Sequence, residues 1–401
     1  MRARLLSVAF GAVAAAASVP AVSAAPDLGG RAAGPSATVV VAGSMSGDTA
    51  ALAVRDRFGP GDASEGYLQL DPEGVRFVAR FTFNAPGEAF DLLVALRAPA
   101  PEAGNWVIQV LGDTGWTTVW RSRVRHSGAW WGESFPLGSP SGAPVVIRVK
   151  GTGSPLDLDR LALAPSPWRP APGTTWQWQL SGAIDTSLDV AMYDIDLFEP
   201  PDAVIQSLHA DGRKVVCYFS AGSWENWRPD AAEFPAEVKG NNLAGWAGEK
   251  WLDVRRLDLL GPIMEARLDL AVSRGCDSVE PDNVDGFTNR TGFPLTGADQ
   301  RRYNTWLAER AHERGLSVGL KNDLDQVRAL VPLFDWALDE QCFEYDECET
   351  LLPFVGEGKA VFGVEYQGSP DSFCPRAVAY GFSWLKKRLA LGPWVIACPA
   401  V

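Results

Sequence analysis

The chain has 401 residues, which is more than one domain usually contains, so two domains are expected. Hydrophobic residues make up 46% of the sequence, enough for a sizeable core, and the composition excludes a disordered or low-complexity protein. The formal net charge of −13 at pH 7 disfavours nucleic acid and other polyanions as partners and favours cationic ones.

The first 25 residues have the pattern of a secretory signal peptide. Arg2 and Arg4 precede an apolar run over residues 5–17, and small residues follow at positions 22–24. The run is too short and too rich in alanine to predict a stable membrane span, and no later segment is apolar enough. We therefore expect a secreted protein, extracellular or at the cell surface, that makes no contact with a membrane.

Residues 36–164 consist of short segments rich in β-branched and aromatic residues, which predict strands. Gly, Pro, Asn and Asp separate these segments at intervals typical of a β-sandwich. Exported sandwich domains often bind glycans, and tryptophans could supply a stacking platform or equally belong to the core. These tryptophans are Trp106, Trp116, Trp120, Trp130 and Trp131. The Pro-rich run over residues 165–173 predicts a semi-rigid linker.

From residue 174 onwards, strand patterns alternate with amphipathic helical patterns. The eight expected strands are 174–180, 189–195, 214–220, 276–282, 317–323, 334–340, 360–366 and 394–399. The clearest helical patterns cover 201–212, 259–275, 298–315 and 375–390. Several of them finish on Gly, as helices commonly do. Strands that alternate with crossovers predict an α/β fold, a (β/α)8 TIM-type barrel over residues 174–401.

Carboxylates follow five of the eight expected strands. Because active sites in this fold lie at the C-terminal ends of the strands, we expect these side chains to share one rim. Carboxylates are costly to bury unless they are used, so the pattern indicates an enzyme.

The richest of these strand ends is the stretch CDSVEPDNVDG, residues 276–286. Glu280 and Asp282 point to the same face of an extended chain, and Pro281 favours the end of the strand. The alternative is a plain acidic loop, or one that binds calcium, because DNVDG also resembles a metal loop. We favour a catalytic role without a metal or other cofactor, since similar carboxylate-tipped strands recur downstream.

All six cysteines lie in the C-terminal half, and an oxidising compartment would allow disulfides. Cys342–Cys348 would close a short loop, and Cys374–Cys398 would join the last strand to the segment before the last helix. Cys217 and Cys276 lie beside buried strands and are expected to be small core residues. A zinc site is disfavoured because the spacing lacks a paired CxxC and the chain has only 3 His.

The same half contains distinctive strings between Trp176 and Tyr366: WQWQLSG, YDIDLFE, CYFSAGSWENWRPD, EPDNVDG, GFPLT, GLKND, EQCFEYDEC and VEY. In this order they resemble glycoside hydrolase family 114, the endo-α-1,4-polygalactosaminidases. The resemblance implies a (β/α)8 barrel that hydrolyses α-1,4-linked galactosamine polymers with acidic catalytic residues. It does not extend to the strand-rich segment before residue 165.

Glycoside hydrolysis usually needs one carboxylate as acid and another as nucleophile or base. In an α-galactosaminide the 2-acetamido group is cis to the leaving group, so it cannot act as the nucleophile and a retaining enzyme must supply its own. We assign Asp282, at the end of the fourth strand, as nucleophile and Glu340, at the end of the sixth, as general acid/base. The expected substrate-binding residues are Asp194, Asp196, Tyr218, Glu280, Asn283, Asp285, Lys321, Asn322, Asp323, Glu365 and Tyr366.

The expected partner is a cationic or partly deacetylated galactosamine polysaccharide, bound by a monomer. Two alternatives remain open: a (β/α)8 glycosidase of other sugar specificity, and a non-catalytic glycan-binding or adhesion protein. The complete set of Glu280, Asp282 and Glu340 argues against the second alternative, because a protein without catalysis would have no need to keep all three.

Overall fold

The structure is a computed structural model that describes residues 40–41, 52–56, 66–70, 77–83, 89–97, 106–112, 115–121, 131–138, 145–151 and 156–399. The chain divides into two compact units between Ser166 and Pro167. The predicted signal peptide lies outside the described residues. No helix among the described residues is both long enough and apolar enough to cross a membrane.

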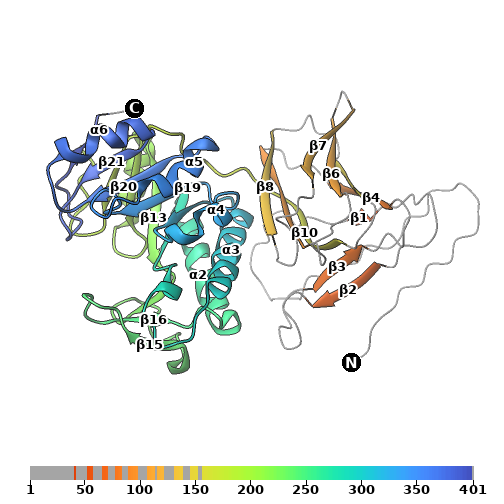
Figure 1. Cartoon of the computed structure of the whole chain (residues 1–401), viewed down its shortest axis with the longest axis horizontal. Coiled ribbons are helices and arrows are strands. Elements are labelled where there is room, and N and C mark those ends of the chain that lie inside the picture. The colour runs from red at the N-terminus through yellow and green to blue at the C-terminus, as the bar shows by residue number, and fades with distance from the viewer. Residues whose placement is uncertain are drawn as a thin grey trace, which may run out of the picture. The chain divides into compact units, whose positions relative to one another are not determined.

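The described strands of the first unit form two antiparallel sheets (Figure 1). One sheet has the order β1 (Val40–Val41), β4 (Phe77–Phe83), β9 (Val145–Gly151), β6 (Val107–Gly112) and β7 (Gly115–Arg121). The other has the order β2 (Leu52–Asp56), β3 (Gly66–Leu70), β10 (Leu156–Pro165), β5 (Phe90–Arg97) and β8 (Trp131–Gly138). These elements agree with the strand-rich pattern of residues 36–164, and their assembly into a sandwich stays a prediction.

The tryptophans of the first unit differ in their exposure. Trp106 and Trp120 are buried, with 1% and 4% of their surface exposed, so these two side chains do not contribute to a platform on the surface. Trp116 is half-buried. The side chains of Trp130 and Trp131 lie outside what the structure describes.

The second unit is built on a nine-stranded sheet whose strands follow chain order. They are β11 (Trp176–Gln179), β12 (Met192–Asp196), β13 (Lys214–Ser220), β17 (Ser278–Asp282), β18 (Ser317–Lys321), β19 (Trp336–Glu340), β20 (Val361–Glu365), β21 (Ser383–Lys386) and β22 (Ile396–Ala397). The first eight are parallel and β22 is antiparallel to β21. This arrangement gives a TIM-barrel-like sheet.

Each face of this sheet packs into its own core, because successive side chains of a strand point to opposite sides. Trp178, Trp336 and Phe362 belong to the core on the inner face. Cys217 and Val318 belong to the core on the outer face, which is shared with the helices. Burial on both faces explains why the parallel strands appear in the sequence as almost continuous apolar runs.

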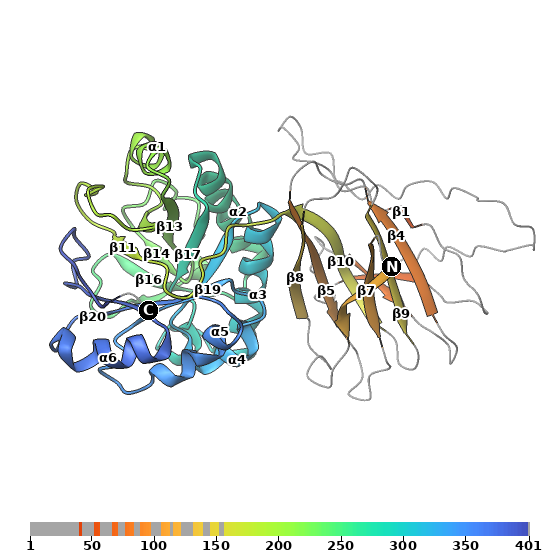
Figure 2. The same cartoon turned by 90° about the horizontal axis from the view of Figure 1, so that it is seen from above.

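Helices surround the sheet on its outer side (Figure 2). They are α1 (Asp202–Ala210), α2 (Leu257–Arg274), α3 (Gly297–Glu313), α4 (Val327–Leu330), α5 (Leu352–Gly356) and α6 (Pro370–Tyr380). Short 3-10 helices are η2 (Ala236–Val238), η3 (Gly286–Thr288), η4 (Leu324–Gln326) and η5 (Cys348–Leu351). Helix α3 begins with a capping box between Thr296 and Asp299, and α2 and α6 end on the left-handed glycines Gly275 and Gly381.

The barrel-like sheet departs from the ideal (β/α)8 pattern at its first and last strands. No helix is described between β11 and β12, and no ladder joins β11 to β21 among the described residues. The seam between these strands is bridged instead by side chains. Trp176 Nε1 donates to the Ser383 carbonyl oxygen at 3.0 Å, and the buried Lys387 Nζ donates to Gln177 Oε1 at 3.1 Å.

The eighth parallel strand was predicted wrongly. The expected helix over 375–390 ends at Tyr380, and β21 follows at once, whereas the expected eighth strand at 394–399 contains only the short antiparallel β22. Gly381 ends the helix in the left-handed conformation (φ 77°). Consecutive Trp384 and Leu385 are both buried, because β21 packs on both faces, so its sequence lacks the alternation that marks a strand.

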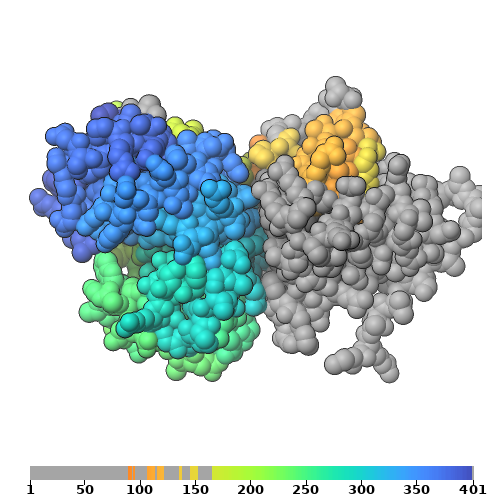
Figure 3. Space-filling view, in the orientation of Figure 1, coloured from red at the N-terminus to blue at the C-terminus, as the bar shows by residue number. Residues whose placement is uncertain are grey.

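A small antiparallel sheet is inserted between β13 and α2. It consists of β14 (Ser223–Glu225), β16 (Glu249–Leu252) and β15 (Lys239–Asn242) in that order. We call residues 223–252 the insert. It forms the green lobe that carries the labels β15 and β16 in Figure 1. The surface is hollowed where the green lobe meets the blue segments that follow β19 (Figure 3).

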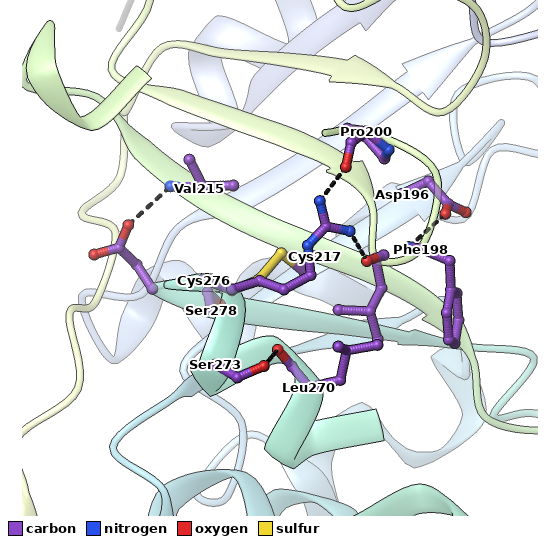
Figure 4. The surroundings of a disulfide bond; sticks show 12 residues. Asp196, Phe198, Pro200, Val215, Cys217, Leu270, Ser273, Cys276 and Ser278 are labelled. Carbon is purple, nitrogen blue, oxygen red and sulfur yellow. Dashed lines mark hydrogen bonds between the residues drawn. A yellow bond between two sulfur atoms is a disulfide. The ribbon is translucent and has the colours of Figure 1, made fainter. Parts of the chain in front are cut away.

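The three disulfides of the second unit include both expected pairs, Cys342–Cys348 and Cys374–Cys398. The third pair, Cys217–Cys276, corrects the prediction that these two cysteines are merely small core residues. Cys217 lies on β13 and Cys276 lies two residues before β17, its neighbour in the sheet (Figure 4). The bond therefore closes the excursion that contains the insert and α2, with a sequence separation of 59.

Candidate active site

Inward-facing side chains at the C-terminal ends of β17, β18 and β19 meet in the mouth of the barrel-like sheet. They are Glu280 and Asp282 from β17, Lys321 from β18 and Glu340 from β19. Val279 points to the outer core, as alternation requires. Because β17 and β19 are the fourth and sixth strands of the sheet, the two proposed catalytic carboxylates come from alternate strands.

Lys321 lies at the centre of this group and is only 2% exposed. Its Nζ is 3.0 Å from Asp282 Oδ1, 3.0 Å from Glu340 Oε2 and 3.4 Å from Glu280 Oε1. Burial opposes the charged form, but the carboxylates, Asp282 first, more than offset this and raise the pKa of Lys321 well above its ordinary value. One buried ammonium group therefore joins three carboxyl groups.

Asp282 is held by donors on the neighbouring strands β13 and β18 and by the backbone of the next residue, Asn283. Oδ1 accepts from Asn283 N at 2.7 Å, and Oδ2 accepts from Tyr218 OH at 2.9 Å. Burial, followed by the charge of Asp282, raises the pKa of Tyr218 well above its ordinary value, so this hydroxyl remains a donor. The Asp282 side chain is 16% exposed, and so it is oriented but still accessible.

Glu340 is the most exposed of the three carboxyl groups at Lys321, with 25% of its side chain accessible. Its Oε1 accepts a hydrogen bond from Tyr366 OH, and its backbone N–H donates to Asn322 Oδ1 at 3.1 Å. Burial and the charge of Glu340 raise the pKa of Tyr366. Two of the predicted binding residues, Tyr366 and Asn322, therefore orient Glu340.

Glu280 lies below this layer with no exposed surface. Its Oε2 accepts from Trp178 Nε1 at 3.0 Å. The fully buried Asp194 is its other neighbour: burial, followed by the charge of Glu280, raises the pKa of Asp194 well above its ordinary value. The raised pKa favours the protonated form of Asp194 beside Glu280.

Asp285 and Asp323 continue the acidic rim beside Asp282. Burial raises the pKa of Asp285 to about 6, with Asp282 the next cause. Burial and the charge of Asp285 raise the pKa of Asp323 to about 8, although Asn304 Nδ2 donates to Asp323 Oδ2 at 2.9 Å. Burial is the main cause of both raised pKa values, and the neighbouring acidic groups add to it.

Among the residues that the structure describes, no three His, Cys, Asp or Glu side chains are grouped as ligands of a metal ion. In the DNVDG stretch, Asp282 Oδ1 lies 3.0 Å from the ammonium nitrogen of Lys321.

Comparisons with known proteins identify the family of the chain. The model of glycoside-hydrolase family GH114 matches residues 159–401. The chain belongs to this family. As a GH114 member it is a glycoside hydrolase, and the match covers the whole barrel-like unit.

Solved structures give a second comparison for this GH114 member. The chain is 42% identical to Aspergillus fumigatus Ega3, crystallised in complex with galactosamine, over 59% of this chain and 99% of that chain, with a TM-score of 0.57. The glycoside hydrolase domain of PelA from Pseudomonas aeruginosa is 12% identical over 56% of this chain and 97% of that chain, with a TM-score of 0.45. The comparison with curated proteins found no match.

Two predicted binding residues of the GH114 unit are engaged away from Lys321. Asp196 Oδ2 forms an ion pair with Arg228 Nη1 at 2.7 Å, and Asp196 Oδ1 accepts from Phe198 N at 2.8 Å. Glu365 points to the outer side of β20, and its Oε1 accepts a hydrogen bond from Phe343 N at 2.9 Å. The structure therefore does not bring Asp196 and Glu365 to the group around Lys321.

The insert adds polar residues to the GH114 site that the sequence did not reveal. Glu249 on β16 is buried, and Ser223 Oγ donates to its Oε2 at 2.8 Å. Burial raises the pKa of Glu249 to about 7. The alternation of the EKWL segment is a weak signal for a strand, and nothing in it marks Glu249 as buried beside an active site.

Proposed function

We propose that this protein is an endo-acting hydrolase of α-1,4-linked galactosamine-containing polysaccharide. Membership of GH114 and the similarity to Ega3, which was crystallised with galactosamine, support this substrate class. The excess of carboxyl groups over cations at the rim also supports it, because a deacetylated amino sugar carries an ammonium group that such a site attracts.

The catalytic pair of the proposal is Asp282 as nucleophile and Glu340 as general acid/base. The observation that carries it is their common contact with Lys321. Asp282 Oδ1 and Glu340 Oε2 each lie 3.0 Å from Nζ, so these two oxygens cannot be further apart than twice that distance. This short separation of the nearest oxygens supports a retaining mechanism, in which the two carboxyl groups stand about 5–5.5 Å apart.

In the first step, Asp282 attacks the anomeric carbon as the glycosidic C–O bond breaks. Glu340 gives its proton to the departing oxygen, and a covalent glycosyl ester forms on Asp282. In the second step, Glu340 takes a proton from water, whose oxygen attacks the anomeric carbon and releases Asp282. Lys321 stays an ammonium group in both steps and holds the two carboxyl groups in place.

The other rim residues are proposed to act in three ways. Asp194 and Glu280 hold Lys321 from below, because both are buried beyond the reach of a sugar. Tyr218, Asn322 and Tyr366 orient the catalytic pair through the hydrogen bonds described above. Asp285, which is partly exposed, is proposed to bind the ammonium group of a neighbouring sugar, and the buried Asp323 is proposed to support this acidic side of the site.

The direct test uses fully deacetylated and fully acetylated α-1,4-galactosamine polymers side by side. We expect internal cleavage of the deacetylated polymer and, by NMR of the first product, an α-anomer that shows retention. Cleavage of only neutral polymers would indicate a glycosidase of other specificity, and binding without cleavage would indicate a glycan-binding protein. Glu357→Gln, which changes an exposed acid of the same unit, is the control.

Three further proposals concern the whole protein. We propose that it is secreted after removal of residues 1–25, which N-terminal sequencing of protein from culture medium would test. We propose that residues 36–164 form a β-sandwich. We also propose that this domain contains a glycan-binding site, which binding assays with the isolated polysaccharide would test. We also propose a monomer, for which the measurement is light scattering during gel filtration.

A further inference from the structure

A chain of hydrogen bonds connects the insert to the catalytic rim. Glu249 Oε2 accepts from Ser223 Oγ at 2.8 Å, and Ser223 Oγ lies 2.7 Å from Ser220 Oγ. Ser220 Oγ in turn accepts from Asn283 Nδ2 at 2.9 Å. Glu249 is 7% exposed and neither serine is exposed at all, so water does not compete for these bonds. The chain ends at the residue that follows Asp282.

Glu249 sets the direction of this chain. A serine hydroxyl has one proton to donate and two lone pairs that accept. Because Ser223 gives its proton to Glu249, the Ser220 hydroxyl must give its own proton to Ser223. The Ser220 oxygen is then free to accept from Asn283. Without an acceptor at position 249, Ser223 can donate to Ser220, and the Ser220 proton then opposes the Asn283 amide donor.

Asn283 needs this support because its backbone is left-handed, with φ of 60°. A non-glycine residue in that region costs on the order of 1 kcal/mol unless its surroundings hold it there. Its carbonyl oxygen also packs against Gly222, where a Cβ atom would lie 1.7 Å away. In this conformation the Asn283 N–H donates to Asp282 Oδ1 at 2.7 Å. The backbone of Asn283 therefore helps to set the orientation of the Asp282 carboxylate.

We propose that Glu249 is a positioning residue that holds Asp282 in its reactive orientation through Ser223, Ser220 and Asn283. The inference rests on the proposed function, since it takes Asp282 as the nucleophile. Glu249 acts through other side chains and does not contact the substrate. Its loss therefore disturbs the orientation of the nucleophile and leaves the binding of the polysaccharide almost intact.

The experiment compares kcat and KM of variants on deacetylated galactosamine polymer. Glu249→Leu removes the acceptor, and we expect kcat to fall about 10–100-fold, the range for a small misplacement of a reacting group, with little change in KM. Glu249→Gln keeps an acceptor oxygen for Ser223, so it should restore most of the kcat lost in the leucine variant. Glu233→Leu removes an exposed glutamate from the same insert and is the matched control.

The hydrogen-bond chain makes a further prediction about pairs of changes. Ser223→Ala breaks the same chain as Glu249→Leu, so the double variant should be about as active as the slower single variant. Multiplied losses would mean that the two residues act independently and would overturn the proposal. The proposal would also fail if Glu249→Gln were as slow as Glu249→Leu. The loss of kcat would then come from the missing charge and not from the missing hydrogen bond.

A crystal structure of Glu249→Leu gives a readout that does not depend on the substrate. We expect Asn283 to leave the left-handed region or Asp282 to turn away from its present donors. An unchanged Asn283 and Asp282 would overturn the proposal even if the wild-type protein proved inactive on galactosamine polymers. Inactivity of the wild type on these polymers, by contrast, would refute the proposed function and leave the structural result to decide the role of Glu249.

Discussion

At the N-terminal ends of β17 and β19, a carboxylate has its own cationic partners, whereas at the C-terminal ends three carboxyl groups gather at one lysine. Asp335, just before β19, illustrates the first arrangement. Its Oδ1 lies 2.6 Å from Arg169 Nε, and its Oδ2 lies 2.7 Å from His312 Nε2 and accepts from Val318 N at 3.0 Å. Burial opposes ionisation, but His312 and Arg169 more than offset it and hold the pKa of Asp335 well below its usual range.

Asp277, just before β17, repeats this arrangement. Lys214 Nζ lies 2.7 Å from its Oδ1, His209 Nε2 lies 2.9 Å from its Oδ2, and Val215 N donates to the same oxygen at 2.9 Å. The same two strands end in Asp282 and Glu340, which share Lys321. The comparison indicates that carboxylates at the strand starts serve stability, while those at the strand ends are kept short of cations for chemistry.

The largest effect is expected from neutral replacements at the strand ends. Asp282→Asn and Glu340→Gln preserve shape but remove the nucleophile or the acid, so turnover should fall by at least about 10³-fold. The melting temperature should change little, because Lys321 keeps two carboxyl partners in either variant. Steady-state kinetics and calorimetry of the purified variants would test this. Near-normal turnover in Asp282→Asn together with an inactive Glu280→Gln would move the nucleophile to Glu280.

The reverse pattern is expected at the strand starts. Asp335→Asn should lower the free energy of unfolding by about 3 kcal/mol, as expected when one partner of a buried ion pair is removed, with turnover per folded molecule maintained. Urea denaturation at neutral pH would measure the loss. Asp269→Asn breaks the exposed pair with Arg314 and should cost under about 1 kcal/mol. Equal losses in the two variants would contradict the comparison.

The pH dependence of that loss follows from the lowered pKa of Asp335. A carboxyl group whose pKa is lower when folded stabilises the protein above its unfolded pKa of about 3.9. This contribution disappears as the pH falls towards the folded pKa. The gap in unfolding free energy between wild type and Asp335→Asn should therefore be full at pH 6 and narrow below about pH 4. A gap that stayed constant down to pH 2 would show that the charge is not responsible.

At the strand ends the sign is opposite. The pKa of Asp323 is raised to about 8, so its ionisation destabilises the folded protein as the pH rises from about 4 to 8. Asp323→Asn keeps an oxygen for Asn304 and does not ionise. Relative to the wild type it should gain about 3–4 kcal/mol of unfolding free energy between pH 5 and pH 8. Denaturant titrations at both pH values test this. A difference in unfolding free energy between variant and wild type that was the same at both pH values, or smaller at pH 8, would contradict the prediction.

The smallest effect concerns salt. If the acidic rim attracts a polycation, screening should weaken binding, because charges interact over only about 8 Å at physiological ionic strength. Between low and high salt, KM for the deacetylated polymer should rise about threefold or more while kcat stays nearly constant. An affinity that does not change with salt would show that the excess of carboxylates at this end does not contribute to substrate binding.

The barrel-like unit and the charged group at its rim could largely be predicted from the sequence, because buried parallel strands leave apolar runs and their polar ends follow directly. Asp282, Lys321 and Glu340, which meet at this rim, were predicted in this way. Other features depend on tertiary contacts that leave no local pattern. β21 is too short and too fully buried to alternate. Glu249 is buried only because the insert folds back onto the rim.

The Cys217–Cys276 disulfide joins the two strands between which the insert and α2 leave and return, with their Cα atoms 6.0 Å apart. A protease that cut the chain once within that excursion would therefore yield two pieces that stay covalently attached. The nicked protein would migrate as a single species on a denaturing gel until a reductant was added. The enzyme could tolerate such a cut and still keep β13 and β17 in register.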